Sequence, residues 1–247
     1  MQAKISHCPF NRSGLNHKDS RSAPLTDRLR EQTEPLHASL EQLPFSQLLF
    51  SGDLPRSVYL QYLLGLRLVY QSLEAEIKSW SQVYDKTLEA FYPVFRSQLI
   101  DEDIQVLSGG SSTQSLVNLP KDLIESIHGS LERTLALAYV RFLGDLGGGQ
   151  LLARQLRTRW QLPLGHSNGL AMYAYHEQVP ELRKKVKSVI NGLSLSVVQQ
   201  ELILKAAESM FKLHRQWFLQ LMPQNVVIQS FLSGVIHEPQ KTQHSRG

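Results

Sequence analysis

Apolar residues recur at helical spacing along most of the chain. In the first predicted helix, the residues that share one face are Leu25, Leu29, Leu36 and Leu40. The same periodicity predicts further helices at about 56–80, 84–107, 120–144, 145–160, 180–192 and 196–221. Strand-like alternation of apolar and polar residues is nearly absent. The pattern therefore predicts an all-α fold in a single domain, without repeats of fixed period.

One of these predicted helical regions contains a run of glycines. The segment FLGDLGGGQLLAR (142–154) holds four glycines within six residues, together with the carboxylate of Asp145. Each glycine in a helix interior costs about 1 kcal/mol relative to alanine, so the run predicts a break or a kink. Because glycine has no Cβ, a flat ligand could lie directly on this backbone with Asp145 at its rim. A glycine-rich loop or a close helix–helix contact would have the same composition.

The composition narrows the class of protein. The chain has 247 residues, a formal net charge of +4 and a sequence pI near 9.2. This mild basicity suits an acidic ligand or protein partner, but it is too weak and too evenly spread to indicate nucleic acid binding. The single cysteine, Cys8, excludes an internal disulfide framework and fits a reducing compartment.

The ends of the chain differ in character from its middle. We expect a disordered tail over 1–24, a helical domain over 25–222, and a polar extension over 223–247 that is mobile at its end. No apolar run approaches the roughly eighteen residues of a membrane-spanning helix, and the first residues lack the apolar core of a secretory signal. We therefore expect a monomer without a membrane anchor in the cytoplasm, with a plastid as the alternative location.

His37 is the first candidate for metal chemistry. It lies at the edge of the apolar face of the first predicted helix, and Glu41 follows four residues later, within reach of the imidazole. A histidine whose second ring nitrogen is held by a carboxylate is the usual arrangement of a metal ligand. Taken alone, a helix histidine that binds no metal is the commoner case.

Two segments together resemble the heme oxygenase family. AYVRFLGDLGGGQLL (138–152) closely resembles the family's distal helix, and LREQTEPLHASLEQLPF (29–45) resembles its proximal-histidine helix. The similarity continues through LVYQSLEAEI (68–77) and GLAMYAY (169–175) and covers roughly residues 25–221. The resemblance implies a single-domain, heme-oxygenase-like helical bundle with a kinked, glycine-rich distal helix.

The resemblance also implies roles for individual residues. His37 would be the axial ligand of the heme iron, and Glu41 would hold its other ring nitrogen. Gly144 and Gly148 would be the catalytic-site glycines whose backbone lies against the porphyrin. Asp145 would be the catalytic carboxylate, acting through ordered water.

Six further residues match heme-binding positions of the family, as propionate partners, as part of the distal network or as walls of the pocket. They are Arg30, Tyr139, Arg183, Lys187, Phe211 and Phe218. Without the resemblance, the cations would be read as a solvated helix face and the two phenylalanines as ordinary core. Tyr70 and Arg141 match positions that extend the hydrogen-bond network of Asp145.

Two departures from the family pattern concern the first helix. Glu34 occupies a position where mammalian members carry a propionate-side lysine, and a carboxylate there would repel a propionate. Pro35 lies two residues before His37, where an interior proline costs about 3 kcal/mol. The helix is therefore expected either to restart near Thr33 or to kink, and both would change the tilt of His37.

The resemblance implies an enzyme that cleaves heme at the α-meso carbon to biliverdin, carbon monoxide and ferrous iron. Heme would be both substrate and prosthetic group, and O2 the co-substrate. Because the sequence has no flavin or nicotinamide fingerprint, electrons would come from a partner such as a ferredoxin or an NADPH-dependent reductase. The alternatives are a non-catalytic heme-binding or sensor protein on the same scaffold, and a related helical protein that binds no heme.

Overall fold

The computed structural model describes residues 22–109, 121–162 and 168–222. Within these ranges the secondary structure is helical and contains no strand, which confirms the prediction of an all-α fold. The expectations for a tail within 1–21 and for the extension over 223–247 lie outside the described residues. No helix in the described ranges combines the length and the apolar character that crossing a bilayer requires.

Most of the consecutive helices are joined by short connections. The α-helices are α1 (Leu25–Glu41), α2 (Pro44–Ser51), α3 (Arg56–Val83), α4 (Ser97–Leu107), α5 (Lys121–Glu125), α6 (Leu131–Ala138), α7 (Gly144–Arg159), α8 (Val179–Gly192) and α9 (Val197–Gln220). The other helical segments are the 3₁₀ segments η2 (Lys86–Val94) and η4 (Ala171–Tyr173) and the π-helical turn η3 (Tyr139–Leu143).

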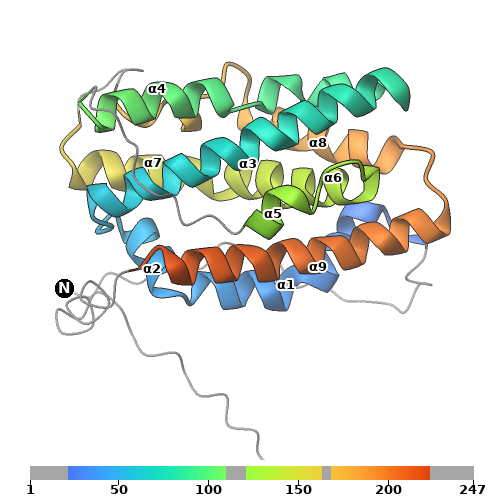
Figure 1. Cartoon of the computed structure of the whole chain (residues 1–247), viewed down its shortest axis with the longest axis horizontal. Coiled ribbons are helices and arrows are strands. Elements are labelled where there is room, and N and C mark those ends of the chain that lie inside the picture. The colour runs from blue at the N-terminus through green and yellow to red at the C-terminus, as the bar shows by residue number, and fades with distance from the viewer. Residues whose placement is uncertain (1–21, 110–120, 163–167, 223–247) are drawn as a thin grey trace, which may run out of the picture.

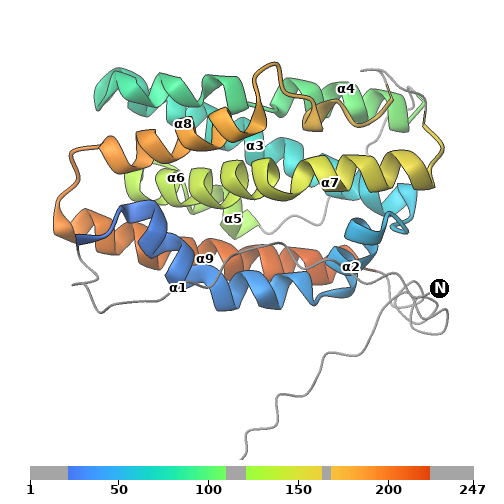
Figure 2. The ribbon, with the colours of Figure 1, turned by 180° about the vertical axis from the view of Figure 1, so that it is seen from behind.

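The long helices lie roughly along the long axis of the molecule (Figure 1). α6, η3 and α7 run in line through its middle, with α3 on one side and α8 on the other (Figures 1 and 2). α1 and α9 lie side by side along one edge and contact each other extensively. The line formed by α6, η3 and α7 is therefore surrounded by helices from both ends of the chain.

Pro35 neither ends nor restarts the first helix. α1 is continuous from Leu25 to Glu41, with Pro35 inside it and exposed. A proline at this position removes one backbone donor but places its ring in solvent, where it displaces no packed side chain. The helix is thus one unit, and His37 follows the proline by two residues within it.

In the first half of the chain, two local features differ from the periodicity-based prediction. The segment expected as one helix over 84–107 is divided into η2, a 3₁₀ segment that contains Pro93, and α4, and the extended backbone of Phe95 separates the two. α2 was not predicted as a separate helix. It begins at Pro44, where a proline is well tolerated, and ends at Gly52, which has φ +81°.

The irregularity of the central helix line lies before the glycine run and not within it. Residues 139–143 form the π turn η3, whereas Gly144 to Gly149 belong to the regular helix α7. A π turn adds one residue to a helical turn and is frequent at functional sites. The predicted break within the glycines is therefore wrong, and the irregular turn of this helix line is η3, directly before the glycine run.

A buried carboxylate fixes η4 against α4. Asp103 of α4 is 1% exposed and accepts hydrogen bonds from the backbone amides of Ala171, at 2.6 Å, and Met172, at 2.9 Å. η4 in turn carries Tyr173, whose ring packs directly against Gly149 of α7. Asp103 thus determines, through η4, which side chain covers the buried side of the glycine run.

The titration of Asp103 gives a first prediction. Burial raises the pKa of Asp103 to about 6 although both backbone amides lower it. Between pH about 4 and 6 the folded protein retains a proton that the unfolded chain has lost. The contribution of this group to the free energy of unfolding therefore falls by about 3 kcal/mol as the pH rises through that range. Urea unfolding at several pH values should show this fall in the wild type and not in Asp103→Asn. Equal pH slopes in the two proteins would contradict the assignment.

The two sides of the glycine run should respond oppositely to an added methyl group. A Cβ on Gly149 would lie 2.9 Å from Cδ1 of Tyr173, whereas a Cβ on Gly147 would meet nothing within 4 Å. Gly149→Ala should lower the free energy of unfolding by about 1–3 kcal/mol through overpacking. Gly147→Ala, the matched control, should raise it by up to about 1 kcal/mol through helix propensity. Chemical denaturation of both variants without added ligand measures the difference.

Candidate functional site

Asp145, in the first turn of α7, is held by two side chains from different elements. Nη2 of Arg141, in η3, lies 2.7 Å from one carboxylate oxygen and 2.8 Å from the other. The hydroxyl of Tyr70, from α3, donates a short hydrogen bond to Oδ2. The side chains of Arg141 and Asp145 are only 7% and 13% exposed. The carboxylate is thus fixed in orientation by an ion pair and a phenol.

The groups around this ion pair hold their protons firmly. Burial is the largest single influence on Arg141 and lowers its pKa, but Asp145, Tyr62 and Tyr70 together outweigh burial and raise the pKa of Arg141 well above its usual range. Burial and the charge of Asp145 together raise the pKa of Tyr70 well above its usual range. The pKa of Tyr62, whose hydroxyl accepts a 3.4 Å hydrogen bond from Arg141, is also raised, chiefly by burial. Arg141, Tyr62 and Tyr70 therefore all keep their protons near neutral pH.

The glycines of α7 present an open side and a covered side. A Cβ on Gly144 or on Gly147 would meet no atom within 4 Å, and both residues are exposed. Gly149 is buried against Tyr173. Gly148, which the sequence predicted to face a porphyrin, lies against the ring of Phe50 from α2, and a Cβ on Gly148 would be 3.4 Å from Cε1 of that ring. The bare positions on the open side are therefore Gly144 and Gly147.

His37 and Glu41 lie together on an exposed part of α1. Nδ1 of His37 is 3.5 Å from Oε1 of Glu41, and the two side chains are 55% and 52% exposed. The imidazole also meets the ring of Phe211 from α9 edge-on, with 6.0 Å between ring centroids. The predicted pairing of His37 with Glu41 is thus present, and one aromatic ring flanks the imidazole.

The open side of the glycine run and the imidazole belong to helices that run in the same direction. Tyr139, at the start of η3, is linked by a side-chain hydrogen bond to Thr33 of α1. α1 and the α6–α7 line both run left to right in Figure 2. One turn further along each helix come His37 and Gly144. At the far end, Phe50 of α2 touches Gly148. In the sequence, these two contacts come before and after His37 and Gly144.

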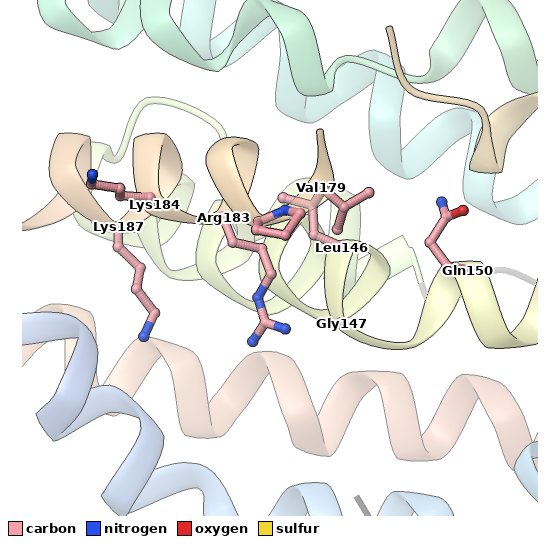
Figure 3. Close-up of a pocket in the computed structure, with 8 residues that line it drawn as sticks. Leu146, Gly147, Gln150, Val179, Arg183, Lys184 and Lys187 are labelled. Carbon is pink, nitrogen blue, oxygen red and sulfur yellow. The ribbon is translucent and has the colours of Figure 1, made fainter. Parts of the chain in front are cut away.

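A basic groove opens beside the same glycines. A volume of about 720 Å³ lies between α7 and α8 and is lined by Leu146, Gly147, Gln150, Val179, Pro180, Arg183, Lys184 and Lys187. Arg183 and Lys187 extend away from α8 on the same side, whereas Lys184 lies along the helix (Figure 3). Within the described residues, no carboxylate forms an ion pair with any of these three cations. The groove is therefore suited to an anionic group lying next to the glycine backbone.

The remaining predicted residues are distributed around this space. Arg30 is exposed on α1, and its charge together with the Thr33 hydrogen bond lowers the pKa of Tyr139, which burial raises. Phe218 does not contact the imidazole of His37. Its ring packs on Phe45, with 4.6 Å between centroids, in the aromatic core. Of the two predicted aromatic walls, only Phe211 touches His37.

Two residues near Arg141 were missed by sequence reasoning. Tyr62 lies eight positions before Tyr70 on α3, so the two share a helix face, and this spacing could have indicated it. His214 is completely buried on α9 and lies three residues after Phe211 and four before Phe218. It therefore shares the face of the two predicted aromatic residues.

Fold and site together define a class of protein, an all-helical bundle with a bare glycine backbone next to a buried acid and an exposed histidine paired with a glutamate on another helix. The family model described as heme oxygenase matches residues 23–220. The chain belongs to the heme oxygenase family, which confirms the resemblance found in the sequence.

Individual relatives agree with this assignment. The chain is 25% identical to heme oxygenase 1 of Gallus gallus, covering 94% of this chain and 80% of the relative. It is 29% identical to heme oxygenase 2 of Synechocystis sp., covering 78% and 80% of the two chains. A solved structure of Synechocystis heme oxygenase-2 in complex with heme and NO has a TM-score of 0.77 at 24% identity, covering 89% of this chain and 95% of that one.

The Arg141–Asp145 pair should contribute strongly to stability. Asp145→Asn leaves the buried guanidinium without its counter-charge and should lower the free energy of unfolding by about 3 kcal/mol. Adding Arg141→Met should recover a large part of this loss. Asp101→Asn is the matched control, because its partner Arg67 lies at 3.3 Å and both side chains are partly exposed, so the change should stay below about 1 kcal/mol. Equal losses at the two sites, measured by urea unfolding, would contradict the role of burial.

Proposed function

We propose that the protein is a heme oxygenase that uses O2 and externally supplied electrons to cleave heme at the α-meso carbon, giving biliverdin, carbon monoxide and ferrous iron. The observations that carry the proposal are the imidazole of His37 held by Glu41 on α1 and the bare backbone at Gly144 with Asp145 fixed beside it. We propose that these two parts lie on opposite faces of a bound heme. Family membership supports the same reaction.

The side chains present fit a heme. Nδ1 of His37 faces Glu41, so Nε2 is the ring nitrogen left to bind iron. A porphyrin face can approach a helix closely only where side chains are missing, as at Gly144 and Gly147. The cations of Arg183 and Lys187 supply charge for propionates at the edge of the same glycine face. Bound heme would supply the iron that activates O2 and the ring that is cleaved.

Other residues would orient the imidazole, position water and line the site. Glu41 orients the imidazole of His37 and favours the tautomer in which Nδ1 carries the proton. Asp145 orients water on the glycine side, because Arg141 and Tyr70 fix both of its oxygens and leave it no freedom to swing toward the ligand. Phe211 places an apolar ring beside the imidazole. The glycines of α7 contribute no side chain on their side.

The charges around the expected heme edge are unequal. α8 contributes the cations of Arg183 and Lys187, whereas α1 contributes Arg30 together with the carboxylate of Glu34, whose charge also raises the pKa of Tyr139. An anionic edge is therefore held more strongly at α8 than at α1. We propose that the propionates lie chiefly against α8.

Electrons must come from another molecule, and we propose an acidic ferredoxin or an NADPH-dependent reductase. The exposed Lys184, which lines the same groove as Arg183, provides a positive charge close to the expected heme edge. We further propose that the protein acts as a monomer in the cytoplasm or in a plastid.

Hemin binding and turnover test the proposal with a matched pair of variants. Hemin should give an intense Soret band, and a reductant in air should turn the sample green with biliverdin. His37→Ala should weaken hemin binding by more than about tenfold, equal to about 1.4 kcal/mol. His128→Ala is the control, because this histidine is also 55% exposed and lies 3.0 Å from a carboxylate, that of Glu76.

Each contrary outcome has a distinct meaning. Equal hemin affinity in the two variants would refute the ligand assignment. Hemin that binds but stays intact under reducing conditions would indicate the non-catalytic heme-binding alternative. Absence of a Soret band in the wild type would refute heme binding altogether.

A further inference from the structure

Phe50 of α2 leaves part of an aromatic ring uncovered at the edge of the glycine run. Phe50 is 38% exposed, whereas its neighbours on the same helix, Leu48 and Leu49, are 2% and 5% exposed. The covered part of the ring lies on α7, where Cε1 and Cζ are 3.4 Å and 3.6 Å from the position of a Cβ on Gly148. One portion of the ring thus packs on the glycine backbone, and the remainder faces solvent.

The end of α2 is attached to α7 at two further points, so the ring does not stand on a free segment. α2 lies beside the later part of α7 (Figure 2). A Cβ on Gly52, the C-cap residue of α2, would lie 2.7 Å from Cγ of Arg159 and 3.0 Å from the backbone oxygen of Gln155. Asp53 forms an ion pair with Arg159 at 3.3 Å. These contacts hold the ring of Phe50 at a fixed position relative to the glycine backbone.

The bare part of α7 therefore has a definite end. Gly144 and Gly147 would each meet nothing within 4 Å if a Cβ were added, whereas Gly148 is covered by Phe50. Leu151 follows Gly147 by four residues, so it is the next side chain on that helix face, and it is 51% exposed. Apolar side chains thus follow the bare backbone on α7 and on α2.

The two sides of the glycine face differ in charge. Arg183 and Lys187 line the groove between α7 and α8 beside Gly147, whereas Phe50 lies on the α2 side, at Gly148. A heme carries carboxylates at one edge only, and methyl and vinyl groups occupy the rest of its periphery. A carboxylate placed against an apolar ring would lose hydration without gaining a partner. A heme with its propionates at α8 would therefore present methyl or vinyl groups to Phe50, where contact buries apolar surface on both sides.

We propose that Phe50 is a specificity-determining residue, which closes the glycine face at its α2 end and contacts the methyl or vinyl groups of bound heme. Because α2 holds the ring in place, this contact limits how far a porphyrin can move along α7 and which of its edges can point toward α2. The position of the porphyrin relative to Gly144 and Asp145 then determines which meso carbon is cleaved. This inference rests on the proposed function and adds to it the residue that selects the in-plane orientation.

A crystal structure of the protein with hemin tests the contact directly. The ring of Phe50 should remain on Gly148 and should lie about 3.5–4.0 Å from a methyl or vinyl carbon of the porphyrin. A porphyrin that covers Gly148 with the ring displaced, or one that leaves a gap to Phe50, would overturn the proposal.

Proton NMR of the cyanide complex of the hemin-loaded protein tests the orientation without turnover, because the heme methyl signals differ between in-plane orientations. The wild type should show one dominant set of signals. Phe50→Ala should show a second set of comparable intensity, with hemin affinity lowered by less than about tenfold because only part of the ring is lost from the contact. Phe50→Leu keeps much of the apolar volume and should restore the single dominant set.

Leu202→Ala is the matched control for these variants. Leu202 is 48% exposed and lies on α9, nine residues before Phe211, so its removal also deletes an exposed apolar side chain. This variant should keep the wild-type signals. Two equal sets in the wild type, or a single unchanged set in Phe50→Ala, would overturn the proposal.

The products of turnover test the consequence for cleavage. Phe50→Ala should raise the fraction of biliverdin isomers other than α several-fold, as measured by chromatography, and Leu202→Ala should not. A wild-type isomer pattern in Phe50→Ala would overturn the effect on cleavage. Wild-type hemin that binds in one orientation and is not degraded would refute the proposed function while the orientation result stands. Wild-type protein that binds no hemin would overturn both.

Discussion

The ion pair between Arg141 and Asp145 is the interaction on which the site depends. Its two partners belong to η3 and to the first turn of α7, so it closes the junction where the central helix line changes its geometry. Tyr70 adds a contact from α3, and Tyr62 touches the guanidinium from the same helix. Because a buried charge without its partner is costly, these contacts hold the junction in a single arrangement. The position of the glycine backbone follows from that arrangement.

The site combines this rigid half with a more exposed one. The acid and its partners are buried, whereas His37 and Glu41 are more than half exposed, and nothing lies close to the open positions Gly144 and Gly147 of α7. A large flat ligand would cover apolar and backbone surface on both sides at once, and its charged edge would meet the cations of α8. The exposure of His37 and Glu41 is therefore consistent with ligand binding, since the ligand itself would complete the packing between α1 and α7.

Much of this arrangement could be predicted from the sequence, because it depends on local spacing or on one long motif. The spacing of His37 and Glu41 places them on one face of a helix, and the structure pairs them. The segment around Asp145 indicated the family, and with it Tyr70 and Arg141 as partners. The helical pattern of the core gave the fold class, because a 3.6-residue period is visible without knowledge of neighbouring helices.

What could not be predicted depends on contacts between distant segments. The apolar spacing in LALAYVRFL (135–143) is that of an ordinary α-helix, so nothing in the sequence indicates the π turn. Phe50 covers Gly148 only because α2 packs on α7. Nε2 of His214 is buried without a hydrogen-bond partner among the described residues, and the sequence alone cannot distinguish a satisfied core histidine from an unsatisfied one.

The geometry of the site depends on the number of residues in the π turn η3. An α-helix rotates by about 100° per residue, so the one additional residue in η3 sets the angular position of everything that follows it on α7. Removing a single residue there would yield a more regular helix and would rotate Asp145 away from Tyr70, while turning a different set of α7 residues toward α1. The same residues in the same order, one position out of phase, would form a well-packed bundle without a site.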